Sequence, residues 1–152
     1  MKQRIDYYAA SPETLQAMLA LEEQVKAHCF DPALYELVKI RVSQLNGCAY
    51  CLDMHTHEAR AAGETEARLH LLAAWRESPL YTRRERAALA WAEAVTLVAT
   101  RGVPDDVFTE AAGEFNESEL ARLTLAINTI NSWNRLAVSS RMVHPVVHPA
   151  IA

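Results

Sequence analysis

Helix-breaking residues are scarce in this chain, and most of them separate segments of helical periodicity. Only four of the 152 residues are glycine and six are proline. Gly47, Gly63 and Gly102 each follow a segment whose apolar residues recur every three or four positions. Twenty-six alanines and an aromatic content of 7% add to the helical preference, because strands favour aromatic and β-branched side chains. No segment alternates apolar and polar residues for long enough to form a strand. The sequence therefore predicts an all-α fold.

Start and stop signals divide the chain into individual helices. In Ser11-Pro12-Glu13 the serine suits an N-cap and the proline suits a first turn, and Asp31-Pro32 repeats the pattern. Thr82 and Glu85 have the spacing of a capping box. We expect a compact bundle of six to seven helices, forming a single domain over residues 1–152. The predicted helices span residues 11–30, 31–46, 48–62, 65–76 and 82–100, with two more that begin at residues 104 and 116.

Charge and hydropathy exclude several classes of partner. The chain has 15 basic and 19 acidic residues, and a net charge of −4 argues against a nucleic acid or an anionic membrane as partner. The longest apolar-rich stretch, 87–99, contains Glu93 and is shorter than the roughly 20 residues of a membrane span. No apolar run of signal-peptide length follows Met1, so we expect a cytoplasmic location. In that compartment, three cysteines argue for catalytic or metal-binding chemistry rather than a disulfide framework.

Two of the cysteines form a Cys-x-x-Cys pair at the start of the helix predicted over 48–62. Cys48 follows Gly47, so unpaired N–H groups and the helix dipole favour a thiolate there. At 100° per residue, Cys48, Cys51 and His55 share one helical face. His55 lies one turn beyond Cys51, within reach to exchange a proton with it. One thiolate can attack a peroxide or a disulfide, and the other thiol can resolve the product as an intramolecular disulfide.

Besides this redox-active dithiol, two other interpretations of the pair stay open. One is a zinc site formed by Cys48, Cys51, His55 and His57. His57 faces roughly the opposite side of the helix, however, and no second Cys/His pair supplies a fourth ligand. The other is a pair of small thiols buried as hydrophobic side chains. A thioredoxin-like site is excluded, because its motif lies in a βαβ unit that a helical chain lacks.

The wider pattern around the pair resembles a known family. Glu36 is followed by eleven residues and then by Cys48-x-x-Cys51-x-x-x-His55. This motif is similar to that of the alkyl hydroperoxidase D (AhpD)-like branch of the carboxymuconolactone decarboxylase superfamily. The part of the chain that carries the motif covers about residues 31–62, and looser similarity continues through the segments 82–90 and 131–135. The decarboxylase branch lacks this cysteine pair, which argues against lactone chemistry.

The resemblance implies an all-helical homo-oligomer, a trimer or hexamer, with thiol-dependent hydroperoxidase activity in antioxidant defence. By analogy with the family, Cys51 is the thiol that attacks the peroxide. Cys48 is the resolving thiol and the one more exposed to a reducing partner, while Glu36 and His55 form the proton relay that activates Cys51. The implied partners are a small hydroperoxide and a dithiol reductant, of dihydrolipoyl type if the family is followed closely. The residues present require no metal, flavin or haem.

Two details depart from this picture. Position at the helix N-terminus favours Cys48 rather than Cys51 as the more readily ionised thiol. We follow the resemblance because Glu36 and His55 provide Cys51 with a base. Tyr50 stands where better-known members carry a histidine, and a phenol is too weak an acid to shuttle protons well at neutral pH.

The alternative function is a redox-sensing or zinc-binding interaction module without catalytic activity, and a third is disulfide exchange without peroxide specificity. Outside the motif, we expect Cys29 to be a partly buried bystander and Glu93 to be a structural ion-pair partner. A stripe of asparagines every three residues, Asn128, Asn131 and Asn134, predicts a polar seam between helices or subunits. The neighbouring side chains of Trp133 and Arg135 could join the same seam.

Overall fold

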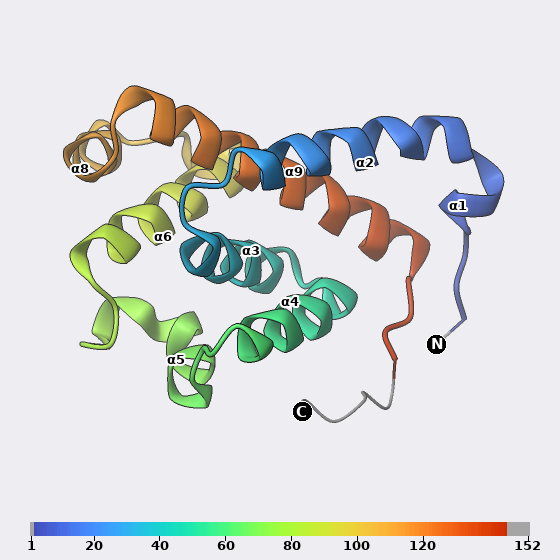
Figure 1. Cartoon of the computed structure of the whole chain (residues 1–152), viewed down its shortest axis with the longest axis horizontal. Helices are drawn as coiled ribbons and strands as arrows, with labels where there is room; N and C mark the ends of the chain where they lie inside the picture. Colours follow the sequence, from blue (N-terminus) through green and yellow to red (C-terminus); the bar gives the residue numbers. More distant parts are fainter. Residues whose placement is uncertain (1, 146–152) are drawn as a thin grey trace.

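The computed structural model describes residues 2–145, and in that range it contains nine α-helices, one 3-10 helix and no strand (Figure 1). The prediction of an all-α fold is therefore confirmed. None of these helices combines the length and apolar character needed to cross a membrane. The elements are α1 (Tyr7–Ala10), α2 (Pro12–Ala27), α3 (Pro32–Asn46), α4 (Ala49–Ala61), α5 (Glu66–Leu71), η1 (Leu72–Glu77), α6 (Arg83–Thr96), α7 (Val98–Arg101), α8 (Asp105–Glu114) and α9 (Glu117–Ser140).

Helix α3 is the central element of the bundle. It packs against α4, α6 and α9, and Figure 1 shows it enclosed between them. The four consecutive residues 37–40 are all buried, which requires neighbours around the whole circumference of the helix. Val38 and Val42 belong to one apolar cluster, and Leu37 and Ile40 belong to a second. A helix in this position can present residues to several partner helices at once.

The residues that were predicted to begin α3 and α6 do so in the structure. The Asp31 side chain accepts a hydrogen bond from the Leu34 N–H, and proline follows it in the first turn of α3. Thr82 and Glu85 form the predicted capping box of α6. A second capping box, between Asn116 and Glu119, opens α9.

The structure divides two of the predicted helices. The one over 65–76 becomes α5 followed by the 3-10 helix η1, which is held against α6 by side chains. The indole of Trp75 donates to Glu93 at 2.9 Å, and the Arg86 guanidinium donates to the carbonyls of Trp75, Arg76 and Ser78. The helix predicted over 82–100 breaks at Leu97 into α6 and α7. In the segment 65–76, these contacts with α6 override the local preference for one continuous α-helix.

The sequence pattern missed the four-residue helix α1. It lies against the end of α9, where the Tyr7 hydroxyl is 3.1 Å from Ser139 Oγ. The backbone N–H of Arg4 donates to the Ser140 carbonyl at 2.7 Å. Such a short helix is marginal by itself, so these contacts with α9 help to hold it in place.

Candidate active site

The turn between α3 and α4 fixes the position of the cysteine pair. Gly47 adopts the left-handed conformation (φ 65°, ψ 34°), and the Cys48 N–H donates to the Ser43 carbonyl at 3.0 Å. Together these features close α3 as a Schellman motif. Cys48 is at the same time the N-cap of α4, because its sulfur accepts a hydrogen bond from the Cys51 N–H at 3.3 Å. A single residue therefore ends one helix and begins the next.

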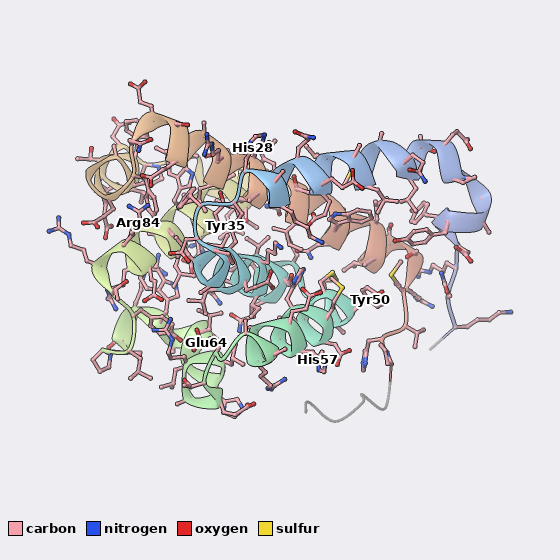
Figure 2. All side chains as sticks on the ribbon, in the orientation of Figure 1. His28, Tyr35, Tyr50, His57, Glu64 and Arg84 are labelled. Carbon is pink, nitrogen blue, oxygen red and sulfur yellow. A yellow bond between two sulfur atoms is a disulfide. The ribbon has the colours of Figure 1, made fainter. Side chains whose placement is uncertain are left out.

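Cys48 and Cys51 are joined by a disulfide, with their Cα atoms 5.4 Å apart. Figure 2 shows it at the end of α4 that carries Tyr50. Both cysteines are buried, with 1% of Cys48 and 2% of Cys51 exposed. In this oxidised form Cys48 is therefore no more exposed than Cys51, contrary to the expectation, because both belong to the same buried apolar cluster.

Glu36 and His55 meet across the interface between α3 and α4. His55 Nδ1 lies 2.9 Å from Glu36 Oε2 and 3.2 Å from Glu58 Oε2. Carboxylates can only accept, so Nδ1 carries the hydrogen and Nε2 is the nitrogen left to exchange protons elsewhere. The structure thus joins Glu36 to His55 and Cys48 to Cys51, and helix α4 carries both His55 and Cys51.

A buried lysine occupies the other side of the Glu36 carboxylate. Lys39 Nζ is 3.0 Å from Glu36 Oε1 and 3.7 Å from Glu22 Oε1, and its side chain is only 8% exposed. The second carboxylate oxygen of Glu22 accepts a hydrogen bond from the Trp133 indole at 3.2 Å. The charged groups therefore form a continuous row from α2 through α3 to α4.

These contacts shift the pKa values of the charged side chains in this row. Burial lowers the pKa of His55, but the hydrogen bonds with Glu36 and Glu58 outweigh it, so the pKa lies above its usual value. Burial raises the pKa of Glu36, yet His55 and Lys39 bring it below its usual value. Lys39 keeps a raised pKa despite burial, because Glu36 and Glu22 surround it. The site therefore favours an imidazolium and an ammonium paired with carboxylates.

A pocket of about 180 Å³ opens beside the disulfide. Cys51 and His55 form part of its wall, together with Lys39 and Glu58. Much of the remaining wall is aromatic or apolar, contributed by Tyr7, Tyr8, Tyr50, Met54, Trp133 and Leu136. Cys48 is not among the lining residues. Small molecules in this pocket can therefore contact Cys51 rather than Cys48.

In this disulfide form, the four zinc ligands of the alternative interpretation are not gathered at one point. Within residues 2–145, the one group of histidine, cysteine and acidic side chains whose ligand atoms all lie within 4.8 Å of one another is Glu36, His55 and Glu58. Figure 2 shows His57 at the edge of α4 away from the disulfide. The Lys39 ammonium beside Glu36 would also repel a cation there.

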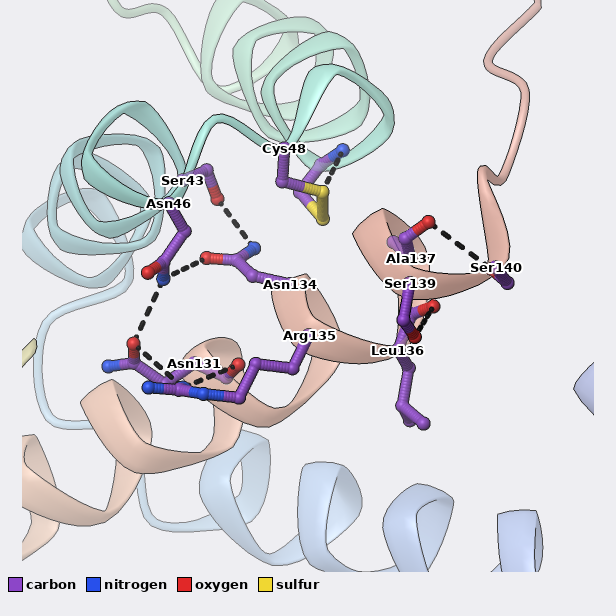
Figure 3. Close-up of a disulfide and its surroundings, with 11 residues drawn as sticks. Ser43, Asn46, Cys48, Asn131, Asn134, Arg135, Leu136, Ala137, Ser139 and Ser140 are labelled. Atoms are coloured by element: carbon purple, nitrogen blue, oxygen red, sulfur yellow. Dashed lines mark hydrogen bonds between the residues drawn. A yellow bond between two sulfur atoms is a disulfide. The ribbon is translucent and has the colours of Figure 1, made fainter. Parts of the chain in front are cut away.

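The predicted asparagine seam exists, with a different membership. Asn46 Nδ2 donates to Asn131 at 2.9 Å and to Asn134 at 2.8 Å, while Asn134 Nδ2 donates to Ser43 Oγ at 3.0 Å (Figure 3). Arg135 joins through Asn131. The seam fastens the end of α3, and hence the Cys48 turn, to α9. Two predicted members lie elsewhere, since Asn128 is exposed and Trp133 lines the pocket.

The two isolated predictions outside the motif agree with the structure. Cys29 is a free, half-buried thiol packed against the core, and burial raises its pKa. A thiol that resists ionisation is a poor nucleophile, which fits a bystander. Glu93 is buried and forms ion pairs with Arg41 and Arg76.

Sequence reasoning missed four residues of the site. Lys39 lies three residues after Glu36, and Glu58 lies three residues after His55, so helical spacing could have identified both. Glu22 and Trp133 come from α2 and α9, and nothing in their local sequence places them beside the motif.

Comparison with family models matches residues 12–94 to the carboxymuconolactone decarboxylase family. The uncharacterized protein YdfG of Bacillus subtilis (strain 168) is 43% identical over 139 residues, covering 91% of this chain and 95% of that protein. The uncharacterized protein YnjA of Escherichia coli (strain K12) is 34% identical over 101 residues, covering 66% of this chain and 55% of that protein.

Solved structures share the fold. A protein of unknown function from Agrobacterium tumefaciens, provisionally named an antioxidant defence protein AhpD, is 46% identical with a TM-score of 0.94. That similarity covers 96% of this chain and all of the other. The debrominase Bmp8 has a TM-score of 0.81 at 21% identity, over 91% of this chain and 74% of its own. The second similarity concerns the fold alone.

Proposed function

This chain belongs to the carboxymuconolactone decarboxylase family, and from that premise we propose that it is a thiol-dependent hydroperoxidase of AhpD type. One observation carries the proposal. Cys51 lines the same pocket as His55, whose Nδ1 is hydrogen-bonded to Glu36 at 2.9 Å. A nucleophilic sulfur, a proton donor and a cavity for substrate therefore occupy one place.

The proposed reaction begins with the reduced pair. The Cys51 thiolate attacks the terminal peroxide oxygen, the O–O bond breaks, and the leaving alkoxide takes a proton from the His55 imidazolium. Cys51 is now a sulfenic acid. The Cys48 thiol attacks its sulfur, water leaves, and the disulfide of this structure results. Glu36 and Glu58 stabilise the imidazolium that this sequence needs.

Access to the sulfurs favours a peroxide over a protein disulfide as oxidant. Both cysteines are almost fully buried, and Cys51 borders a pocket of about 180 Å³. A small hydroperoxide fits such a pocket, whereas a disulfide on the surface of a folded protein does not reach into it. This comparison supports the peroxidase over exchange with disulfides of folded proteins.

The remaining partners belong to the same proposal. A dithiol reductant, of dihydrolipoyl type by resemblance, returns the pair to thiols in the cytoplasm. A homo-oligomer, trimer or hexamer, fits the large apolar side chains exposed on the single chain. Phe108 is 51% exposed and Leu125 is 42% exposed, and both line one shallow groove.

Thiol counting tests the peroxidase directly. Addition of an organic hydroperoxide to the reduced protein should remove two thiols, and peptide mass should show them joined as Cys48–Cys51. Cys51→Ser should abolish thiol-dependent peroxide consumption, while Cys29→Ser should retain it as the matched control. Wild-type activity in Cys51→Ser would overturn the proposal. Stoichiometric zinc that is lost on substitution of Cys48 and Cys51 would instead favour the non-catalytic module.

A further inference from the structure

We propose that the reducing thiol enters the same pocket as the peroxide and attacks Cys51, so that Cys48 is the sulfur that leaves. This inference rests on the proposed redox role of the pair and adds the route and direction of its regeneration. It reverses the expectation that the reductant meets Cys48.

Access is the first reason. An incoming thiolate must reach one sulfur of the disulfide along a free path. Both cysteines are almost fully buried, at 1% for Cys48 and 2% for Cys51, but Cys51 forms part of the pocket wall and Cys48 does not. The Schellman turn buries Cys48 between the end of α3 and the start of α4.

Stabilisation of the leaving sulfur is the second reason. In thiol–disulfide exchange, the sulfur that better holds negative charge leaves faster. Cys48 caps α4, and its sulfur already accepts the Cys51 N–H at 3.3 Å. Helix α4 has 13 residues, so its dipole further favours a negative charge at that position. The position of Cys48 at the helix N-terminus and the base beside Cys51 are therefore compatible. Cys51 attacks the peroxide during oxidation, and Cys48 leaves as a thiolate during reduction.

Each step of the exchange forms one bond to sulfur and breaks another. The reductant thiolate forms a bond to Cys51 Sγ, the Cys51–Cys48 bond breaks, and its electron pair remains on Cys48. The second thiol of the reductant then attacks the reductant's own sulfur in the mixed disulfide. Cys51 leaves as a thiolate, and the reductant departs as a cyclic disulfide. Two electrons pass to the pair, and the two protons of the reductant end on the protein or in solvent.

The pocket also defines the shape of the reductant. Its volume is about 180 Å³, and Tyr50, Met54, Trp133 and Leu136 give it largely apolar walls. A dithiol at the end of a slender apolar arm can enter, whereas a redox motif on a folded protein surface cannot approach the buried sulfur. The peroxide and the reductant therefore occupy the pocket in turn.

Adduct mapping tests the direction of attack. We would oxidise Cys29→Ser protein with diamide, expose it briefly to the monothiol 2-mercaptoethanol, quench with acid and block free thiols. Chymotrypsin cleaves after Tyr50 and so places the two cysteines on separate peptides. We expect at least about tenfold more mercaptoethanol on Cys51 than on Cys48, with the blocking group on Cys48. An adduct mainly on Cys48, equal adducts, or reaction only after unfolding would overturn the inference.

A pocket variant provides a second test. Met54 lines the pocket and is 38% exposed, so Met54→Trp should narrow the entrance without disturbing the core. Rates of peroxide oxidation and of thiol reduction should fall together, at least severalfold. Leu71→Trp, at a residue 43% exposed in α5 and outside this pocket, is the matched control. A slowed oxidation with unchanged reduction would contradict a shared route. Because diamide forms the disulfide in the mapping experiment, failure of the peroxidase proposal alone would leave the mapped adduct on Cys51.

Discussion

The carboxylate of Glu36 and the imidazole of His55, 19 residues apart in the chain, are joined by a 2.9 Å hydrogen bond between α3 and α4. The other oxygen of the same carboxylate is bound by Lys39 at 3.0 Å. Glu36 is therefore held from both sides, and Lys39, which is not one of the four motif residues, helps to orient it toward His55.

Replacing Glu36 with glutamine should lower peroxidase activity while leaving the fold intact. The neutral amide no longer stabilises the His55 imidazolium, so the pKa of His55 falls and less of the proton donor for the leaving alkoxide is present. We expect kcat/KM for an organic hydroperoxide to fall by about 100-fold, the range of general acid catalysis. Steady-state kinetics check this, with exposed Glu77→Gln as control. Unchanged kinetics would remove Glu36 from the relay.

Replacing Glu58 with glutamine should move the pH profile rather than abolish activity. The Glu58 carboxylate, 3.2 Å from His55 Nδ1, raises the pKa of that histidine. Without its charge the pKa falls, so His55 loses its proton at a lower pH. The alkaline limb of the rate profile should therefore shift to lower pH, while the Glu77→Gln profile stays in place. A shift to higher pH would contradict this assignment.

Asn134 of the asparagine seam should contribute much to stability, whereas Asn128, on the same helix but outside the seam, should contribute little. Asn134 is fully buried, and Asn134→Ala leaves the Ser43 hydroxyl and the Asn46 amide short of a partner. We expect a loss of about 2–4 kcal/mol in the free energy of unfolding, measured with urea. Asn128→Ala, on an exposed face of the same helix, should change it by less than about 0.5 kcal/mol. Equal effects of the two changes would contradict a structural role for the seam.

Two glycines should respond to alanine with opposite signs. Gly47 has φ 65°, so Gly47→Ala should destabilise the protein by about 1 kcal/mol through backbone strain, although no atom lies within 4 Å of the added Cβ. Gly113 is exposed within α8 and also has space, so Gly113→Ala should stabilise by about 0.5–1 kcal/mol. Thermal unfolding of the two variants measures both signs.

Local signals predicted much of the fold and the centre of the candidate site. The left-handed Gly47, the Asp31 cap and the Thr82 capping box act within one or two turns, so their consequences are visible in a short window of sequence. The same holds for Cys51 and His55, which helical spacing places on one face. The sequence pattern therefore predicts well those features that depend on residues within one or two helical turns.

Long-range contacts account for what the pattern missed. A lysine is normally exposed unless it is paired, and buried Lys39 is paired both with Glu36 on its own helix and with Glu22 from another helix. The 3-10 segment forms because Trp75 reaches Glu93 in α6, and α1 lies against Ser139 of α9. Burial of Cys48 likewise involves residues outside the motif, since its apolar cluster also contains Ile130 and Ala137 of α9.

The sulfur cap on α4 has a spectroscopic consequence. The Cys51 amide proton is donated to Cys48 Sγ in the disulfide form, at 3.3 Å. A thiolate at the same position would be a stronger acceptor, and a thiol a weaker one. The chemical shift of the Cys51 backbone amide proton in nuclear magnetic resonance spectra therefore reports the oxidation state of the cysteine pair. It can be followed through turnover without an added chemical label.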